Sequence, residues 1–337
     1  MMKRMALWLA CVSAAASVAA LGVRDAAVPA AARPIVMKIG HAQPVTHPRH
    51  DSLLKFKELV ERRTGGQIVV DIYPAGQLGD EESMLDATKL GPLQGTRCGL
   101  FERVSPRLLV YTMPFLFDSL DGIEKVTMGP IGDRIAASAE AGGLLILTTG
   151  DAGGFRQFTN DVRPIVRPSD FTGLRMRTPG VKTIGKTLEA FGALPVVVSY
   201  GDTYAALKSG AADGEENPFI NIRAMRFHEV QKYLTVMNYQ FHPDPFVVNP
   251  AWFRALSAEH QRVLKECAVE SMRYNNRLVK IQNAEAYAAL KNAMQIIELT
   301  PLQREAFIER VYPVYDAMIA EGITTQAELD EIRALAK

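Results

Sequence analysis

The chain has 337 residues and a mass of 37.0 kDa, which at roughly 150 residues per domain suggests about two domains. Its 38 Lys and Arg residues nearly balance 37 Asp and Glu residues, so the basic excess of a nucleic-acid-binding surface is missing and no nucleic-acid partner is expected. Hydrophobic residues make up 48% and charged residues 22%, which is typical of a globular protein and not of a disordered or multi-span membrane chain.

The N-terminal segment has the pattern of a secretory signal. Lys3 and Arg4 precede 19 residues without a charge, and small residues at positions 30–32 offer a cleavage site. An uncleaved membrane anchor is the alternative, but the run is rich in alanine and therefore only weakly apolar. We expect residues 1–32 to be a signal peptide and the remaining chain to be exported to the periplasm.

Strands and helices alternate after the signal. Residues 35–39 alternate as a strand, about 51–63 have helical spacing, and residues 68–72 form the next strand. Three acids at positions 80–82 lie where the N-terminus of a helix favours negative charge. This order predicts an α/β fold with a largely parallel sheet covered by helices.

The pattern repeats in the second half of the chain. Residues 173–177 are predicted to be a strand, 181–191 a helix, 195–198 another buried strand and 203–208 a short helix. From 257 to 292 the sequence runs 36 residues without Pro or Gly. A helix of that length would extend about 50 Å at roughly 1.5 Å per residue, so we expect it to cross both lobes of the protein.

Polar residues follow the predicted strands of this second half. Arg177 ends one strand, Tyr200 lies just past the next, and Asn217 follows the run that begins at Asp213. Ligands of parallel α/β sheets bind beyond the carboxyl ends of the strands, so these three side chains could hold a small acid. The alternative is that Arg177 pairs with a structural acid such as Glu216.

Residues 180–187 (GVKTIGKT) match the phosphate-binding pattern G-x-x-x-x-G-K-[ST]. An exported protein would meet almost no nucleotide, and Lys182 to Thr187 continue the apolar spacing of the predicted helix. An exported nucleotide-binding protein or enzyme that uses this segment is nevertheless kept as an alternative, together with a ligand-sensing module.

Other chemistry-bearing patterns are absent from the sequence. Removal of the signal takes away Cys11, and we expect Cys98 and Cys267 to be buried free thiols. The six His residues show no zinc-binding spacing, and no nucleophile elbow of the form G-x-S-x-G is present. We therefore expect neither a metal, a cofactor nor a catalytic site.

Four short motifs make the chain resemble the DctP-type substrate-binding subunits of tripartite ATP-independent periplasmic (TRAP) transporters. They are residues 73–79 (YPAGQLG), 113–117 (MPFLF), 173–179 (GLRMRTP) and 213–218 (DGEENP). The similarity extends from about residue 35 to 315. The segment around 91–101 departs from the family pattern, because it lacks the usual acidic residue and adds Arg97.

The resemblance implies a two-lobed periplasmic solute-binding protein, type II-like, with a long helix spanning both lobes. Lobe I would contain residues 33–152 plus about 243–282, and lobe II residues 153–242 plus about 283–337. The protein would be a receptor and not an enzyme, and it would need no cofactor. It would bind a small carboxylate and deliver it to the small and large membrane subunits of the permease. We expect it to be a monomer.

The resemblance also assigns roles to residues at the ligand. Arg177 would form the two-pronged salt bridge to the ligand carboxylate, Arg156 would be a second basic position, and Asn217 and Tyr200 would line the cleft. The segments 46–49 and 115–117 would reach the ligand from the opposite lobe. The candidate ligand-binding residues are therefore Arg177, Arg156, Asn217, Tyr200, Phe117, His47 and Glu216.

Overall fold

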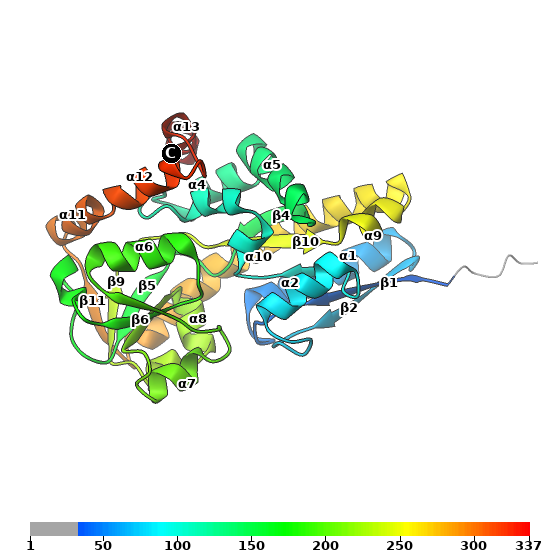
Figure 1. Cartoon of the computed structure of the whole chain (residues 1–337). Helices are drawn as coiled ribbons and strands as arrows, with labels where there is room; N and C mark the ends of the chain where they lie inside the picture. Colours follow the sequence, from blue (N-terminus) through cyan, green and yellow to red (C-terminus); the bar gives the residue numbers. More distant parts are fainter. Residues whose placement is uncertain (1–32) are drawn as a thin grey trace, which may run out of the picture. The chain divides into compact units, whose positions relative to one another are not determined.

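The computed structural model describes residues 33–337 (Figure 1). This part of the chain contains two β-sheets with helices packed against them, which confirms the predicted α/β class. None of the helices within residues 33–337 is long and apolar enough to span a bilayer. The predicted signal peptide, residues 1–32, lies outside the described residues.

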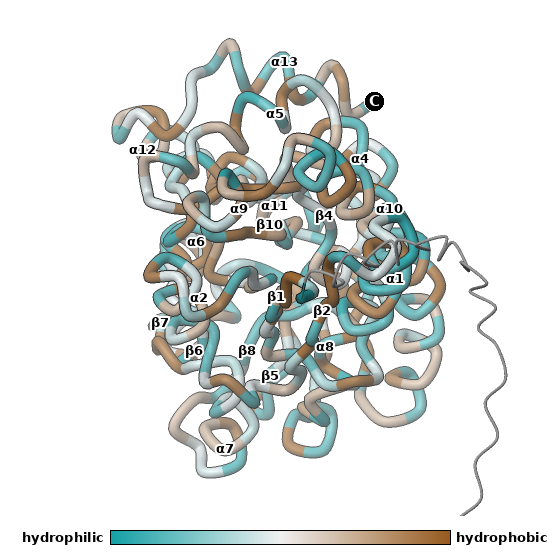
Figure 2. Tube along the Cα trace, turned by 90° about the vertical axis from the view of Figure 1, so that its right-hand side faces the viewer, coloured by the Kyte–Doolittle hydropathy of each residue, from teal (hydrophilic) through white to brown (hydrophobic). Residues whose placement is uncertain are grey.

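The first sheet has five strands in the order β2-β1-β3-β10-β4. Strand β1 pairs in parallel with β2 and β3, whereas β10 is antiparallel to β3 and β4. The strands β1 and β10 carry hydrophobic segments, brown in Figure 2, that lie in the core. Their bounds are β1 Ile35–Gly40, β2 Ile68–Tyr73, β3 Gly95–Arg97, β4 Leu145–Asp151 and β10 Pro243–Val248.

The second sheet has six strands in the order β11-β9-β5-β8-β6-β7. Strand β6 is parallel to β7 and β8, and β11 is parallel to β9, whereas β5 is antiparallel to β8 and β9. Their bounds are β5 Gln157–Asn160, β6 Arg175–Thr178, β7 Leu194–Val197, β8 Gly214–Asn217, β9 Tyr233–Val236 and β11 Gln295–Glu298.

Both sheets are mixed, but only β10 in the first sheet and β5 in the second run against the other strands, so the prediction of a largely parallel arrangement is confirmed. The antiparallel strands β5 and β10 each follow a crossing of the chain from one sheet to the other, after β4 and β9 respectively. Such crossings depend on contacts between distant segments and leave no local pattern in the sequence.

Strand β7 differs from its prediction as a buried strand. It is the edge strand of the second sheet, and Leu194 and Val197 are 56% and 70% exposed. An apolar run of this length is compatible with either a buried or an edge strand, so the sequence alone does not decide its position.

The predicted helices are present with small changes at their ends. Helix α1, Pro48–Arg63, begins earlier than expected because Pro48 occupies its first turn and the His47 side chain accepts a hydrogen bond from Arg49 N. Helix α2, Glu81–Leu90, begins at the predicted acids, with Asp80 as its N-cap. Helices α6, Lys182–Phe191, and α7, Thr203–Lys208, lie where the spacing predicts them.

The other helices extend around these elements. They are α3 Phe101–Val104, α4 Leu120–Thr127, α5 Pro130–Ala137, α8 Phe219–Ala224, α9 Pro250–Ala255, α11 Pro301–Arg310, α12 Tyr312–Ala320 and α13 Gln326–Ala336. Short 3₁₀ segments lie at Pro106–Thr112, Ser138–Gly142, Pro168–Phe171 and Phe227–Glu229. Of the C-terminal helices, α11 and α12 contact α6, and α13 contacts α4.

The predicted long helix is α10, Ala258–Leu290, with 33 residues. Its N-terminal half places Leu264, Cys267 and Met272 in the apolar core of the first sheet. Its C-terminal half places Val279 and Leu290 in a second core that also contains residues of the second sheet. One helix is therefore built into the cores of both lobes, as predicted.

The two cysteines of the described chain are buried and free, which confirms their prediction. Cys98 follows β3, and Cys267 lies on α10. Burial raises the pKa of the Cys98 thiol far above its usual range, so this side chain acts as a small apolar group.

Candidate functional site

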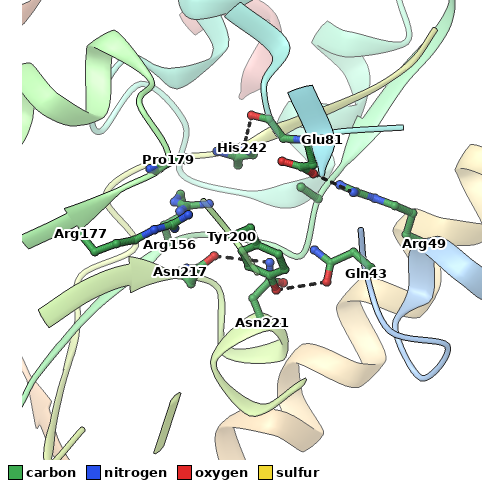
Figure 3. A pocket seen from close by; sticks show the side chains of 12 residues that line it. Gln43, Arg49, Glu81, Arg156, Arg177, Pro179, Tyr200, Asn217, Asn221 and His242 are labelled. Atoms are coloured by element: carbon green, nitrogen blue, oxygen red, sulfur yellow. Dashed lines mark hydrogen bonds and ion pairs between the residues drawn. The ribbon is translucent and has the colours of Figure 1, made fainter. Parts of the chain in front are cut away.

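A cavity of about 30 Å³ lies between side chains carried by the two sheets (Figure 3). Residues from the N-terminal segments and from the segment just before β10 line one side. Residues of β6 and β8, and of the segments that follow β4, β6, β7 and β8, line the other. The lining residues are Gln43, Arg49, Glu81, Gly99 and His242 on the first side and Ala152, Arg156, Arg177, Pro179, Tyr200, Asn217 and Asn221 on the second.

The Arg177 side chain has no ionic partner among the described residues. It is carried by β6 and is 1% exposed. Its Nε donates a hydrogen bond to the carbonyl oxygen of Val198 at 3.0 Å, whereas Nη2 is buried without a partner in residues 33–337. Burial lowers the pKa of this guanidinium, although it remains charged. A buried cation with free donors beside a cavity is suited to binding an anion.

Glu216 pairs with Arg156, and not with Arg177 as the alternative reading of the sequence allowed. The Nη2 atom of Arg156 donates to Oε1 and to the backbone oxygen of Glu216, both at 2.6 Å, and the Tyr239 hydroxyl donates to Oε2 at 2.7 Å. Burial alone would lower the pKa of Arg156, but the Glu216 charge raises it above the usual range. Arg156 therefore lines the cavity as half of a neutralised pair.

Asn217 is fixed by its neighbours at the end of β8. Its Nδ2 donates to Glu215 Oε2 at 2.5 Å, and its Oδ1 accepts a longer bond of 3.4 Å from Asn221, one turn along α8. Burial raises the pKa of Glu215 to about 7. The Asn217 carboxamide is thus oriented by side chains of its own lobe.

Two hydrogen bonds beside the cavity join residues of the two sheets. The Tyr200 hydroxyl donates to Gln43 Oε1 at 3.1 Å, and His47 Nε2 lies 3.2 Å from Asn221 Oδ1. Because His47 Nδ1 accepts from Arg49 N, Nε2 carries the hydrogen of this second bond. Burial lowers the pKa of His47 to about 3, so its ring is neutral.

A buried ionic cluster supports the first side of the cavity. Asp244 Oδ2 accepts from Arg49 Nε at 3.0 Å and from Arg97 Nη2 at 2.5 Å. The Glu81 carboxylate lies 3.5 Å from Arg49 Nη1. Arg97, the residue that departs from the family pattern, is therefore a buried partner of Asp244 and does not line the cavity.

Glu81 and His242 meet at Gly99. Glu81 Oε1 accepts from Gly99 N at 2.9 Å, and His242 Nε2 lies 3.0 Å from Gly99 O. A Cβ atom at position 99 would lie 3.1 Å from His242 Nε2 and 3.3 Å from Glu81 Oε2. The missing side chain of Gly99 thus lets both groups approach the same wall of the cavity.

Four of the seven predicted site residues line the cavity, namely Arg177, Arg156, Tyr200 and Asn217. The other three are buried nearby without lining it. Glu216 holds Arg156, His47 caps α1 and contacts Asn221, and the Phe117 ring packs against Phe241 with their centroids 6.1 Å apart.

Sequence reasoning missed most of the first side of the cavity. Two local signals were present: Arg49 lies in the 46–49 segment, and Glu81 comes two residues after the 73–79 motif. Asn221 follows Asn217 by one helical turn. His242 has no local signal, because only the crossing into β10 brings it to the site.

The segment that matches a phosphate-binding loop forms no such loop. Helix α6 begins at Lys182 and continues through Gly185. The Nζ atoms of Lys182 and Lys186 lie 2.6 and 3.9 Å from Glu321 oxygens, and the buried Thr187 hydroxyl donates to Thr183 O. Both lysines are thus held at an acid and not over a phosphate site. Within residues 33–337, His, Cys, Asp and Glu side chains form no cluster of three suited to a metal ion.

A two-lobed α/β chain with a helix shared by both cores and a cavity between the lobes has the architecture of a solute-binding protein. The family model described as "DctP: Bacterial extracellular solute-binding protein, family 7" matches residues 39–322. The chain therefore belongs to the DctP family, whose members are periplasmic receptors of TRAP transporters and not enzymes.

Similar proteins cover nearly the whole described chain. The C4-dicarboxylate-binding periplasmic protein DctP of Rhodobacter capsulatus is 34% identical over 86% of this chain and 88% of its own. A TRAP solute-binding protein from Shewanella oneidensis with bound succinate has a TM-score of 0.85 at 28% identity, over 90% and 100% of the two chains. One from Polaromonas sp. JS666 bound to D-erythronate has a TM-score of 0.83 at 28% identity, over 90% and 98%.

Proposed function

We propose that this chain is a periplasmic receptor that binds a small organic acid between its lobes and delivers it to the small and large membrane subunits of a TRAP permease. The observation that carries the proposal is the buried guanidinium of Arg177, whose Nη2 has no partner within residues 33–337 and which lines the cavity. The planar donors of Arg match the two oxygens of a carboxylate, so Arg177 forms the two-pronged salt bridge.

The binding free energy expected from a salt bridge with Arg177 is substantial, but it does not reach micromolar affinity without further contacts. Micromolar affinity requires about 8 kcal/mol, and each charged hydrogen bond contributes roughly 1.5 to 3 kcal/mol. A bidentate pair with Arg177 supplies about half of the required free energy. Asn217, Tyr200 and the exclusion of water by the closed lobes supply the rest.

Ligand binding would favour the closed arrangement, because only that arrangement lets both lobes contact the acid. The bonds Tyr200–Gln43 and His47–Asn221 stabilise the same arrangement. In this proposal lobe I is residues 33–152 plus about 243–282, and lobe II is residues 153–242 plus about 283–337. The strands of the two sheets fall on opposite sides of these boundaries, which supports them. Residues 1–32 direct export, and the receptor acts as a monomer.

The test is a thermal-shift screen of organic acids on the chain that begins at residue 33. A ligand at 100 times its dissociation constant adds about 2.7 kcal/mol to the free energy of unfolding, so a true ligand raises the melting temperature clearly. The Arg177→Lys variant should lose this shift, whereas Arg175→Lys, a change two residues earlier at an exposed surface ion pair, should keep it. If the acid raised the melting temperatures of the wild type and of Arg177→Lys equally, the two-pronged salt bridge between Arg177 and the ligand carboxylate would be refuted.

A further inference from the structure

The charges that line the cavity leave one cation for the ligand. Three arginines line it, but Arg156 pairs with Glu216, and Arg49 pairs with Asp244 and Glu81. Arg177 is the one lining arginine without an acidic partner in the described part of the chain. One ligand carboxylate therefore meets a free guanidinium, whereas a second has none.

A second carboxylate would also meet a negative charge. Of the other two lining arginines, Arg156 is paired with Glu216, and the Glu81 carboxylate lies 3.5 Å from the Nη1 atom of Arg49. Glu81 itself lines the cavity and is 11% exposed in its side chain. A carboxylate placed there would have its charge beside that of Glu81 in a site sheltered from water, where repulsion is strong.

The same wall presents hydrogen-bond acceptors. A carboxylate such as Glu81 only accepts hydrogen bonds. His242 Nε2 donates to Gly99 O, so Nδ1 is the bare nitrogen of a neutral ring, and it is buried without a partner among the described residues. His242 Nδ1 thus lacks a donor in the described chain, and Glu81, whose Oε1 accepts from Gly99 N, can accept a further hydrogen bond from the ligand. A ligand carboxylate offers none, but a hydroxyl group does.

We propose that the acid carries a single carboxylate, bound at Arg177, and at least one hydroxyl group that donates to Glu81 or His242, and that the site rejects dicarboxylates. This inference rests on the proposed function and specifies its ligand class. An ammonium group could also donate, but in an α-amino acid it lies next to the carboxylate and therefore beside the unpaired Arg177 guanidinium, so the neutral hydroxyl is favoured. Two of the similar proteins differ in this respect, since one holds succinate and the other D-erythronate.

The size of the cavity limits the length of the acid. It measures about 30 Å³, and roughly 10 to 15 Å³ of such space holds one water molecule. The cavity thus has room for about two or three water molecules, so only short acids suit it, and the lobes must separate slightly to admit a four-carbon acid. Four-carbon acids are the chosen probes because they allow the end opposite the carboxylate to be varied at constant chain length.

The experiment is calorimetric titration of the chain from residue 33 with five four-carbon acids: erythronate, threonate, butyrate, succinate and 2-aminobutyrate. We expect erythronate or threonate to bind at least tenfold more tightly than each of the other three. Succinate or 2-aminobutyrate binding as tightly as the better hydroxy acid would overturn the inference while leaving a carboxylate receptor intact. Butyrate binding as tightly would remove the role of the hydroxyl.

A variant pair tests the residue that sets the selectivity. Glu81→Gln removes the negative charge but retains an oxygen that can accept from Gly99 N, so the preference for the hydroxy acid over succinate should shrink at least fivefold. Glu82→Gln, at the neighbouring exposed acid that pairs with Arg103, should leave the preference unchanged. An unchanged ratio in Glu81→Gln would refute the assignment. If no four-carbon acid binds, the inference fails, and the proposed function is decided separately by the wider acid screen and the Arg177→Lys variant.

Discussion

Replacing Arg177 and Arg156 by methionine should separate the ligand anchor from the structural ion pair. Both guanidiniums are buried and both line the cavity. Arg156, however, neutralises Glu216, whereas Arg177 has no ionic partner in the described chain. Methionine keeps much of the side-chain volume and removes the charge. The two variants therefore differ mainly in whether a buried carboxylate is left without its cation.

The magnitudes follow from these contacts. Arg156→Met leaves the carboxylate of Glu216, which is 0% exposed, without its cation, and breaking a buried pair in this way costs about 3 to 5 kcal/mol. Arg177→Met leaves no buried acid unpaired, so the stability of the ligand-free protein should not fall by more than about 1 kcal/mol. Its affinity for the acid should fall by about 3 kcal/mol or more, which is a factor of at least roughly 100.

Denaturant unfolding of the ligand-free variants measures the first effect, and calorimetric titration with the acid that gives the largest thermal shift measures the second. A loss of stability in Arg177→Met as large as that in Arg156→Met would contradict the reasoning, because it would mean that Arg177 is held by structural partners and is not reserved for the ligand.

Three further predictions concern the interlobe contact, a buried acid and the rejected nucleotide site. Tyr200→Phe removes the hydrogen bond to Gln43 and should weaken acid binding by about 1 kcal/mol, or roughly fivefold in calorimetry; an unchanged affinity would show that this bond does not stabilise closure. Burial raises the pKa of Glu215 to about 7 from its ordinary value of 4.5, so the folded state favours the protonated form, and the free energy of unfolding falls by up to about 3 kcal/mol as pH rises from 4.5 through 7. Glu215→Gln should flatten this decline in unfolding experiments between pH 5 and 8, and an equally steep decline would contradict the assignment. Lys186→Ala should leave acid affinity unchanged, and ATP with Mg²⁺ should not raise the melting temperature of the wild type; a rise that the variant abolishes would restore the nucleotide hypothesis.

The second side of the cavity could be predicted from the sequence because it depends on local order. Arg177 and Asn217 lie in the paired strands β6 and β8, and Tyr200 follows β7, the other neighbour of β6. Neighbouring parallel strands have their carboxyl ends at the same edge of the sheet. Residues at these ends therefore lie close together, independently of how the rest of the chain folds. The long run without Pro or Gly likewise identified α10.

The first side could not be predicted because it depends on long-range packing. His242 reaches the cavity only through the crossing that leads into β10, and Asp244 holds Arg49 from the same strand. The partner of Glu216 could not be decided from the sequence for a similar reason. Arg156 immediately precedes β5 and Arg177 lies in β6, the two strands that flank β8, and only the three-dimensional geometry decides which of them reaches Glu216. In the sequence both arginines carry the same charge, so either could be the partner of Glu216.

The most direct test of the central claim is a crystal structure of the chain with the acid that gives the largest thermal shift. The proposed function predicts both oxygens of one ligand carboxylate within about 2.7 to 2.9 Å of Arg177 guanidinium nitrogens, with the acid enclosed between Asn217 and the Glu81 wall. An acid bound with its carboxylate away from Arg177, or outside the cavity between the lobes, would contradict it.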